Sequence, residues 1–98
     1  MMEPRVEHVK NVNRQSPHVL YIGRGSKWGN PYKLGRDGDR KEVIEKYQSY
    51  LLDSPHLLRS IKRGELDGMT LACYCKPRAC HGDVLRKAWE YMKGSDEE

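Results

Sequence analysis

The feature that most constrains the fold is a short apolar run that leads, within a few residues, into a helical pattern. The run Met69–Cys75 (MTLACYC) has the length and the apolar density of a central β-strand. After it, apolar residues recur at helical spacing and predict an amphipathic helix over about residues 81–92. They are Val84, Leu85, Ala88, Trp89 and Met92. A buried strand followed closely by a helix is typical of an α/β domain.

The rest of the chain supplies two strands and two helices, so the predicted element order is β-β-α-α-β-α. A capping box at Asp39 and Glu42 and a first-turn proline at Pro55 mark the two helix starts. The expected strands cover residues 5–13 and 18–22, and the expected helices cover about 39–52 and 54–64. We expect a small three-layer Rossmann-like domain over residues 1–93, with helices packed on a short sheet and an acidic flexible tail at 94–98.

Length and composition exclude several classes of protein. A chain of 98 residues makes one domain, and no apolar run approaches the roughly 18 residues of a membrane span. The N-terminus lacks the apolar stretch of a signal peptide, so we expect a cytoplasmic protein without a membrane partner. The net charge of +4 permits anionic partners but is equally explained by solubility. Oligomeric state stays open.

The junction between residues 75 and 83 is a candidate anion site. The start of a helix presents backbone N–H groups and the positive end of the helix dipole, and ligands in open α/β sheets bind beyond the carboxyl ends of strands. Lys76 and Arg78 add positive charge. The alternative is an ordinary connection with solvated basic residues. The candidate ligand-binding residues in this segment are Cys75, Lys76, Arg78 and Gly82.

Three residues of the same segment are candidates for catalysis. Cys80 falls at the predicted helix start beside His81, where the dipole and the imidazole both favour a reactive thiolate. Asp83 follows in the first turn and could act as a general base or simply favour the dipole. The sequence does not separate catalysis by these residues from binding alone.

The cysteines also raise the question of zinc. Cys73, Cys75, Cys80 and His81 are zinc-ligand types, but their C-x-C-x4-C-H spacing is not that of the usual structural sites. Cys73 is better explained as a small buried residue of a central strand. We therefore predict no metal and no cofactor, and keep a zinc-stabilised structural module as an alternative.

The glycine-rich segment after the second strand is a candidate recognition loop. Its glycines let the backbone approach a ligand, its basic residues can meet phosphate, and its tryptophan can stack on a base. The alternative for Trp28 is that it packs the loop onto the core. The candidate ligand-binding residues in this loop are Gly23, Arg24, Ser26, Lys27, Trp28, Gly29 and Asn30.

The blocks YIGRGSKWGNPYKLG, EVIEKYQSYLL and LACYCKPRACHGDVL resemble the domain of unknown function 4326 (DUF4326), a family of bacteriophages and prokaryotes. The resemblance covers about residues 18–90. It implies that the GRGSKWGNP and CHGD blocks mark the site, and it implies no established reaction. The CHGD block is also similar to the domain of unknown function 488 (DUF488), an analogy that favours a sheet-based fold.

These observations lead to three hypotheses about function. The first is the binding, with processing or sequestration, of a nucleotide-like, phosphate-bearing small molecule in a pocket formed by the GRGSKWGNP loop and the CHGD helix start. The second is a phage regulatory module that interacts with nucleic acid or a polymerase, for which steep salt dependence would be the signature. The third is the zinc-stabilised module.

Overall fold

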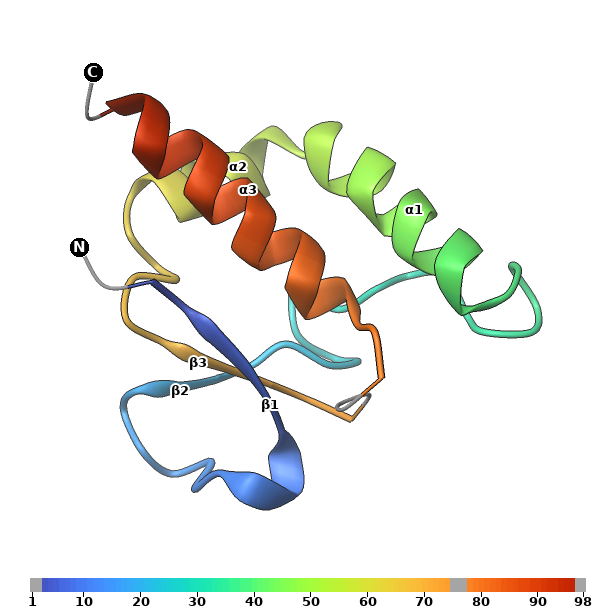
Figure 1. Cartoon of the computed structure of the whole chain (residues 1–98), viewed down its shortest axis with the longest axis horizontal. Coiled ribbons are helices and arrows are strands. Elements are labelled where there is room, and N and C mark those ends of the chain that lie inside the picture. The colour runs from blue at the N-terminus through green and yellow to red at the C-terminus, as the bar shows by residue number, and fades with distance from the viewer. Residues whose placement is uncertain (1–2, 75–77, 97–98) are drawn as a thin grey trace.

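A three-stranded parallel sheet forms the base of the fold, as seen in a computed structural model that describes residues 3–74 and 78–96 (Figure 1). Strand β3 lies in the middle, and β1 and β2 pair with its two sides. Because all three strands run in one direction, their carboxyl ends meet at one edge of the sheet. The strands are β1 (Arg5–His8), β2 (Val19–Tyr21) and β3 (Thr70–Cys73).

The central position of β3 follows from its sequence. Leu71, Ala72 and Cys73 are all buried, whereas every residue of β2 is only half-buried. A strand that pairs on both sides and is covered by other elements needs a continuous apolar run, and this chain has such a run at β3. In the register, Leu71 is level with Val6 of β1 and Leu20 of β2.

Three helices complete the α/β fold that the sequence predicts. Helix α1 begins with the predicted capping box, in which Asp39 accepts from the Glu42 N–H and the Glu42 carboxylate accepts from the Asp39 N–H. Helix α2 has Pro55 in its first turn, as expected. Helix α3 continues past Met92, where the apolar pattern ends. The helices are α1 (Arg40–Leu52), α2 (Pro55–Lys62) and α3 (His81–Asp96).

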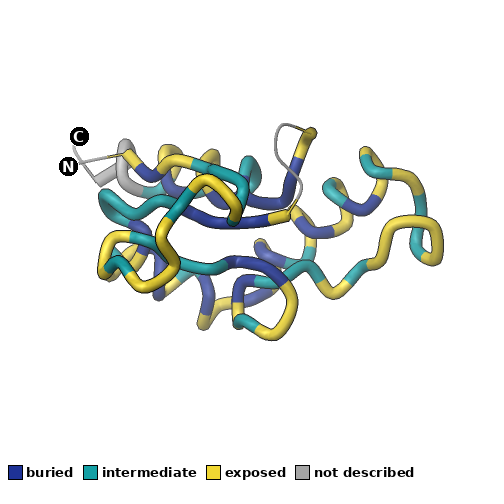
Figure 2. Tube along the Cα trace, turned by 90° about the horizontal axis from the view of Figure 1, so that it is seen from below, coloured by how far each residue is buried: buried dark blue, intermediate teal, exposed yellow. Residues whose placement is uncertain are grey.

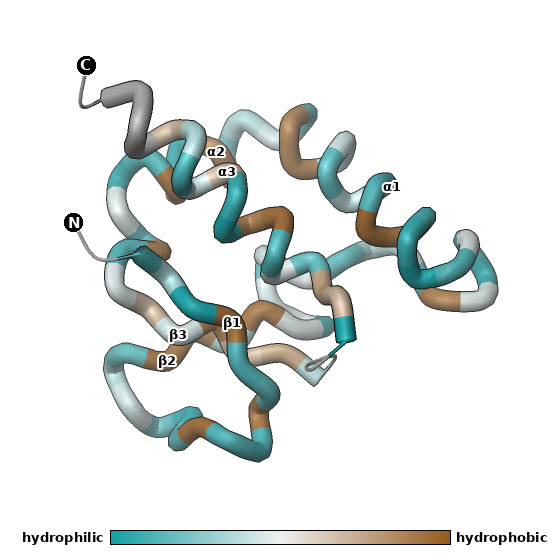
Figure 3. Tube along the Cα trace, in the orientation of Figure 1, coloured by the Kyte–Doolittle hydropathy of each residue, from teal (hydrophilic) through white to brown (hydrophobic). Residues whose placement is uncertain are grey.

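The core lies between the sheet and the helices. The dark-blue buried segments in Figure 2 gather along the middle of the molecule, and the hydrophobic segments in Figure 3 include the strands and stretches of the helices. Fully buried residues come from the sheet, the helices and the loops between them. Trp89 of α3 donates its indole N–H to Asp67 at 2.6 Å. The central members are Ile22, Trp28, Tyr47, Leu51, Leu57, Ile61, Leu71 and Leu85.

The first strand is shorter than predicted. β1 ends at His8, and a 3-10 helix η1 (Val9–Asn11) follows it in place of continued strand. The His8 imidazole Nδ1 accepts from the Lys10 N–H at 3.1 Å, so the chain turns at this point. None of the helices in the described residues is long and apolar enough to cross a membrane.

Candidate functional site

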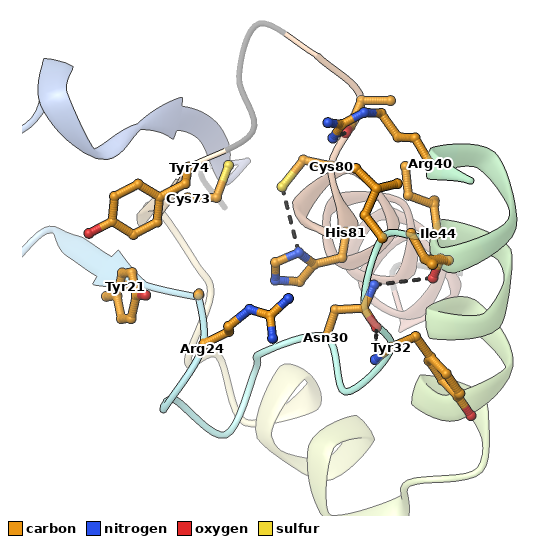
Figure 4. A pocket seen from close by; sticks show the side chains of 14 residues that line it. Tyr21, Arg24, Asn30, Tyr32, Arg40, Ile44, Cys73, Tyr74, Cys80 and His81 are labelled. Carbon is orange, nitrogen blue, oxygen red and sulfur yellow. Dashed lines mark hydrogen bonds between the residues drawn. The ribbon is translucent and has the colours of Figure 1, made fainter. Parts of the chain in front are cut away.

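A pocket of about 250 Å³ opens at the carboxyl edge of β2 and β3, beside α1 and the start of α3 (Figure 4). The loops after two neighbouring parallel strands leave the sheet at the same edge, so this is where an open α/β sheet places a ligand site. The residues that carry the argument below are Tyr21, Gly23, Arg24, Asn30, Arg40, Cys73, Tyr74, Cys80 and His81.

The pocket brings together residues from both predicted blocks. Gly23, Arg24 and Asn30 come from the GRGSKWGNP loop, and Cys80 and His81 come from the CHGD block. Asn30 is held by α1, because its side-chain amide donates to the Val43 carbonyl at 3.1 Å. Arg24 is exposed. Residues of the two blocks therefore line the same cavity.

His81 joins the two blocks. Its Nε2 atom lies 2.7 Å from the Ile22 carbonyl oxygen. A carbonyl oxygen can only accept, so Nε2 carries the hydrogen and Nδ1 of the neutral ring is the acceptor. Burial lowers the pKa of His81, although the Ile22 bond and the charge of Asp83 act in the opposite direction. The neutral imidazole is thus favoured, and its Nδ1 lies 3.6 Å from the Cys80 sulfur.

Cys80 stands immediately before α3 and is buried. The Gly82 N–H donates to the Cys80 sulfur at 3.3 Å. The Asp83 carboxylate accepts from the Cys80 N–H at 3.1 Å, so it caps the helix start. Asp83 does not line the pocket; it faces a second cavity of about 460 Å³ beside β1. Of the three predicted catalytic residues, the pocket therefore holds Cys80 and His81.

Ser26 and Gly29 determine the shape of the loop through contacts within it. The Ser26 hydroxyl donates to the Gly23 carbonyl at 2.7 Å, and the Gly29 N–H donates to the Ser26 carbonyl at 3.1 Å. A Cβ atom on Gly29 would lie 2.8 Å from the Gly23 carbonyl oxygen. Only glycine permits so close an approach of the two backbone segments. These two predicted ligand contacts thus shape the loop and do not line the pocket.

Trp28 packs the loop onto the core, which is the alternative that the sequence left open for it. Its side chain is 1% exposed, and its carbonyl oxygen accepts from the Tyr47 hydroxyl at 2.7 Å. Lys27 also turns away from the pocket: its ammonium lies 2.7 Å from the Glu65 carboxylate and 3.0 Å from the Ser60 hydroxyl. The Lys27 contact lowers the pKa of Glu65.

The remaining predicted residues lie in or near the CHGD block. Gly82 is buried, and a Cβ atom there would lie 2.9 Å from both Ile22 Cδ1 and Val6 Cγ1. Its lack of a side chain lets α3 approach the sheet closely, so its role is in packing. Arg78 is exposed and is not part of the pocket lining. Cys75 and Lys76 lie outside the described residues.

Several lining residues were not predicted as site residues. Tyr21 ends β2 and Tyr74 follows β3, and their rings meet edge to face with centroids 6.2 Å apart. Their positions at strand ends were the signal that could have identified them. Arg40 carried no such signal, because it joins the site through a bond from its guanidinium to the Ala79 carbonyl at 3.0 Å, 39 positions away. Cys73 is buried as expected and also lines the pocket.

The lining combines positive charge, aromatic rings and a buried sulfur–imidazole pair. Arg24 and Arg40 supply the charge, and Tyr21, Tyr32 and Tyr74 supply the rings. Within residues 3–74 and 78–96, no group of three His, Cys, Asp or Glu side chains is placed to hold a metal ion. Such a pocket can bind an anionic ligand that has a flat or apolar part.

Comparison with known proteins gives two matches. The model of the domain of unknown function DUF4326 matches residues 5–91. The uncharacterised 12.4 kDa protein of the nrdA-td intergenic region of Enterobacteria phage T4 is 40% identical over 84 residues, which cover 76% of this chain and 70% of that relative. No solved structure matches the chain significantly.

Proposed function

This chain belongs to the family of the domain of unknown function DUF4326, and we propose that it binds a nucleotide-like, phosphate-bearing small molecule. The observation that carries the proposal is the pocket itself. Arg24 from the loop after β2 and His81 from the start of α3 line one cavity at the carboxyl edge of a parallel sheet. The sequence predicts that these two blocks act together, and their shared cavity supports that prediction.

The charges of the pocket suit a phosphate group. Arg24 is exposed and is available for a ligand, whereas Arg40 already donates to the Ala79 carbonyl and adds a second positive charge nearby. A guanidinium binds phosphate through two parallel N–H bonds. We therefore assign the phosphate to Arg24, with Arg40 in support. Lys27 is left out of this assignment, because Glu65 holds its ammonium.

The tyrosines of the pocket suit the flat part of a nucleotide. Tyr74 is 61% exposed and meets Tyr21 edge to face, and the guanidinium of Arg14 lies 4.3 Å from the Tyr21 ring centroid. The exposed Tyr74 ring offers a face on which a base can stack. The volume of about 250 Å³ is below the usual size of ligand pockets, so the ligand is small or only partly enclosed.

Two broader assignments accompany this proposal. A Rossmann-like arrangement is supported by the all-parallel sheet and by a pocket at its carboxyl edge. A cytoplasmic location is supported by the cluster of three cysteines, whose spacing does not suit a disulfide framework. Sequestration of the ligand and its chemical processing are both compatible with binding in this pocket.

A ligand panel tests the proposal. Thermal-shift assays with nucleotides, nucleotide sugars and cyclic dinucleotides should find at least one compound that stabilises the protein, and calorimetry should show saturable binding. Arg24→Ala should weaken this binding. Arg59→Ala, which removes an exposed arginine of α2, is the matched control and should not. A folded sample that binds nothing in the panel would contradict the proposal.

Binding assays on the same purified protein distinguish the nucleic-acid alternative from small-molecule binding. A single-stranded oligonucleotide that binds when no mononucleotide does, with affinity that falls steeply between about 50 and 200 mM salt, would favour that alternative. Metal analysis of the purified protein addresses the zinc-stabilised module, for which about one equivalent of zinc is the expected content.

A further inference from the structure

The Cys80–His81 pair is more specifically arranged than ligand binding requires. The His81 Nε2–H group is held by the Ile22 carbonyl, so the lone pair of Nδ1 is directed at the Cys80 sulfur, 3.6 Å away. Figure 4 shows this sulfur and the imidazole joined by a dashed line among the side chains that line the pocket. A nucleophile, a base in contact with it and a third group that orients the base are the parts of an activated thiol.

The start of α3 adds a second contribution. The Gly82 N–H donates to the Cys80 sulfur at 3.3 Å, at the positive end of a helix of 16 residues. A backbone N–H and a helix N-terminus both favour a thiolate over a thiol. The imidazolium formed by proton transfer would have hydrogen-bond partners for both of its N–H groups: the Ile22 carbonyl oxygen and the sulfur.

We propose that Cys80 is a nucleophile that His81 activates for attack on an electrophilic carbon of a small molecule held in this pocket. In this step the thiol proton passes to His81 Nδ1 and the sulfur electron pair forms a carbon–sulfur bond. The bond from that carbon to its leaving group breaks, and the leaving group departs with the electron pair. The proton on His81 then passes to the leaving group or to solvent.

This inference uses the pocket of the proposed function but does not depend on the identity of its ligand. Cys73 supplies an internal comparison. Both cysteines line the pocket and both are 1% exposed, but Cys73 ends β3 and Cys80 precedes α3. The contacts from His81 Nδ1 and from the Gly82 N–H are made to Cys80. Because the two cysteines are equally exposed but have different surroundings, a difference in their reactivity reports activation of the thiol and not its accessibility.

Alkylation with iodoacetamide tests the inference without any nucleotide present. In this reaction a carbon–sulfur bond forms, the carbon–iodine bond breaks and iodide leaves. The folded protein is alkylated in buffer with a chelator, and the modification of each cysteine is followed by peptide mass spectrometry. Cys80 should react at least about tenfold faster than Cys73, a modest share of what a positioned base contributes. Equal rates for the two cysteines would overturn the proposal.

His81→Gln tests the role of the imidazole. The glutamine amide can still donate to the Ile22 carbonyl, but it cannot accept a proton from sulfur. The rate at Cys80 should fall to that at Cys73, and the rate at Cys73 should stay the same. An unchanged rate at Cys80 in the folded variant would remove His81 from the mechanism and contradict the proposal.

A measurement on the natural chain covers the case in which this variant does not fold. Unfolding in urea removes the surroundings of both cysteines, so the ratio of their alkylation rates should fall from about ten or more to about one. A ratio that is the same in the folded and unfolded chain would count against activation by the fold. Binding is measured separately by calorimetry, so failure of this inference and failure of the proposed function give different results.

Discussion

The Nε2 atom of His81 lies 2.7 Å from the carbonyl oxygen of Ile22, and this single contact ties the start of α3 to the residue after β2. It joins positions 59 residues apart and sets which imidazole nitrogen faces Cys80. The same contact therefore defines the chemistry available to the His81 imidazole in the pocket. Loss of this contact should lower both the stability of the protein and the reactivity of Cys80.

The stability of the protein should depend on pH through His81. The unfolded side chain titrates near pH 6.5, and burial lowers the pKa of His81 in the folded chain, so between these values the unfolded state binds more protons. The stabilising contribution is complete above about pH 6.5 and is lost as pH falls through the lower folded value. Urea titrations at pH 7.5 and 5.5 should show this decline in the natural chain.

His81→Gln is the control for the pH effect, because glutamine does not titrate. The variant should lose less stability than the natural chain over the same interval, by at most about 1.4 kcal/mol per pH unit. The pKa values of Asp37 and Glu65 are also lowered, but from ordinary values of 3.8 and 4.5, so both stay ionised over this interval. Identical pH dependence in the two proteins would show that His81 is not the source.

Tyr47→Phe should destabilise the protein by about 1–3 kcal/mol, because it leaves the buried Trp28 carbonyl without the hydroxyl that donates to it at 2.7 Å. Chemical denaturation measures the effect. Tyr50→Phe is the matched control on the same helix, since the Tyr50 hydroxyl makes no hydrogen bond among the described residues, and it should change stability by less than about 0.5 kcal/mol. Equal effects of the two substitutions would refute this role for Tyr47.

Gly82→Ala should destabilise the protein even though alanine is the better helix former. The added Cβ would lie 2.9 Å from Ile22 Cδ1 and Val6 Cγ1, and overpacking of this kind costs about 1–3 kcal/mol. Alanine regains up to about 1 kcal/mol of helix propensity, so a net loss is expected. Lys87→Ala at an exposed position of α3 is the control and should be nearly neutral. A more stable Gly82→Ala variant would show that the helix does not pack this closely.

Lys27→Ala should affect the stability of the protein, whereas Arg24→Ala should affect its affinity for the ligand. Lys27 pairs with Glu65 at a half-exposed position, so its loss should cost no more than about 1 kcal/mol of stability and leave affinity intact. Arg24 lines the pocket, so its loss should weaken binding of whichever nucleotide gives the largest thermal shift and leave stability nearly unchanged. Calorimetry and denaturation of both variants check this. Equal losses of affinity in the two variants would show that Lys27 also contributes to ligand binding.

Much of the architecture could be read from local patterns. The apolar run at 69–75 predicted the central strand, and the Asp39–Glu42 capping box predicted the start of α1, because strands and helix starts are determined by neighbouring residues. Two glycine-containing blocks after strands also predicted one shared site, and residues of both blocks line one cavity. The blocks meet because loops that follow neighbouring parallel strands leave the sheet at the same edge.

Only the tertiary structure decided what each side chain of those blocks does. Lys27 and Arg24 are both basic residues of one loop, yet Lys27 turns to Glu65 and Arg24 lines the pocket. Arg40 reaches the site through a carbonyl 39 positions away. Local sequence determines backbone conformation, but the direction and partner of a side chain depend on packing between distant segments. The sequence by itself thus predicted at which edge of the sheet the candidate site lies, and the folded chain decided which residues line the cavity there.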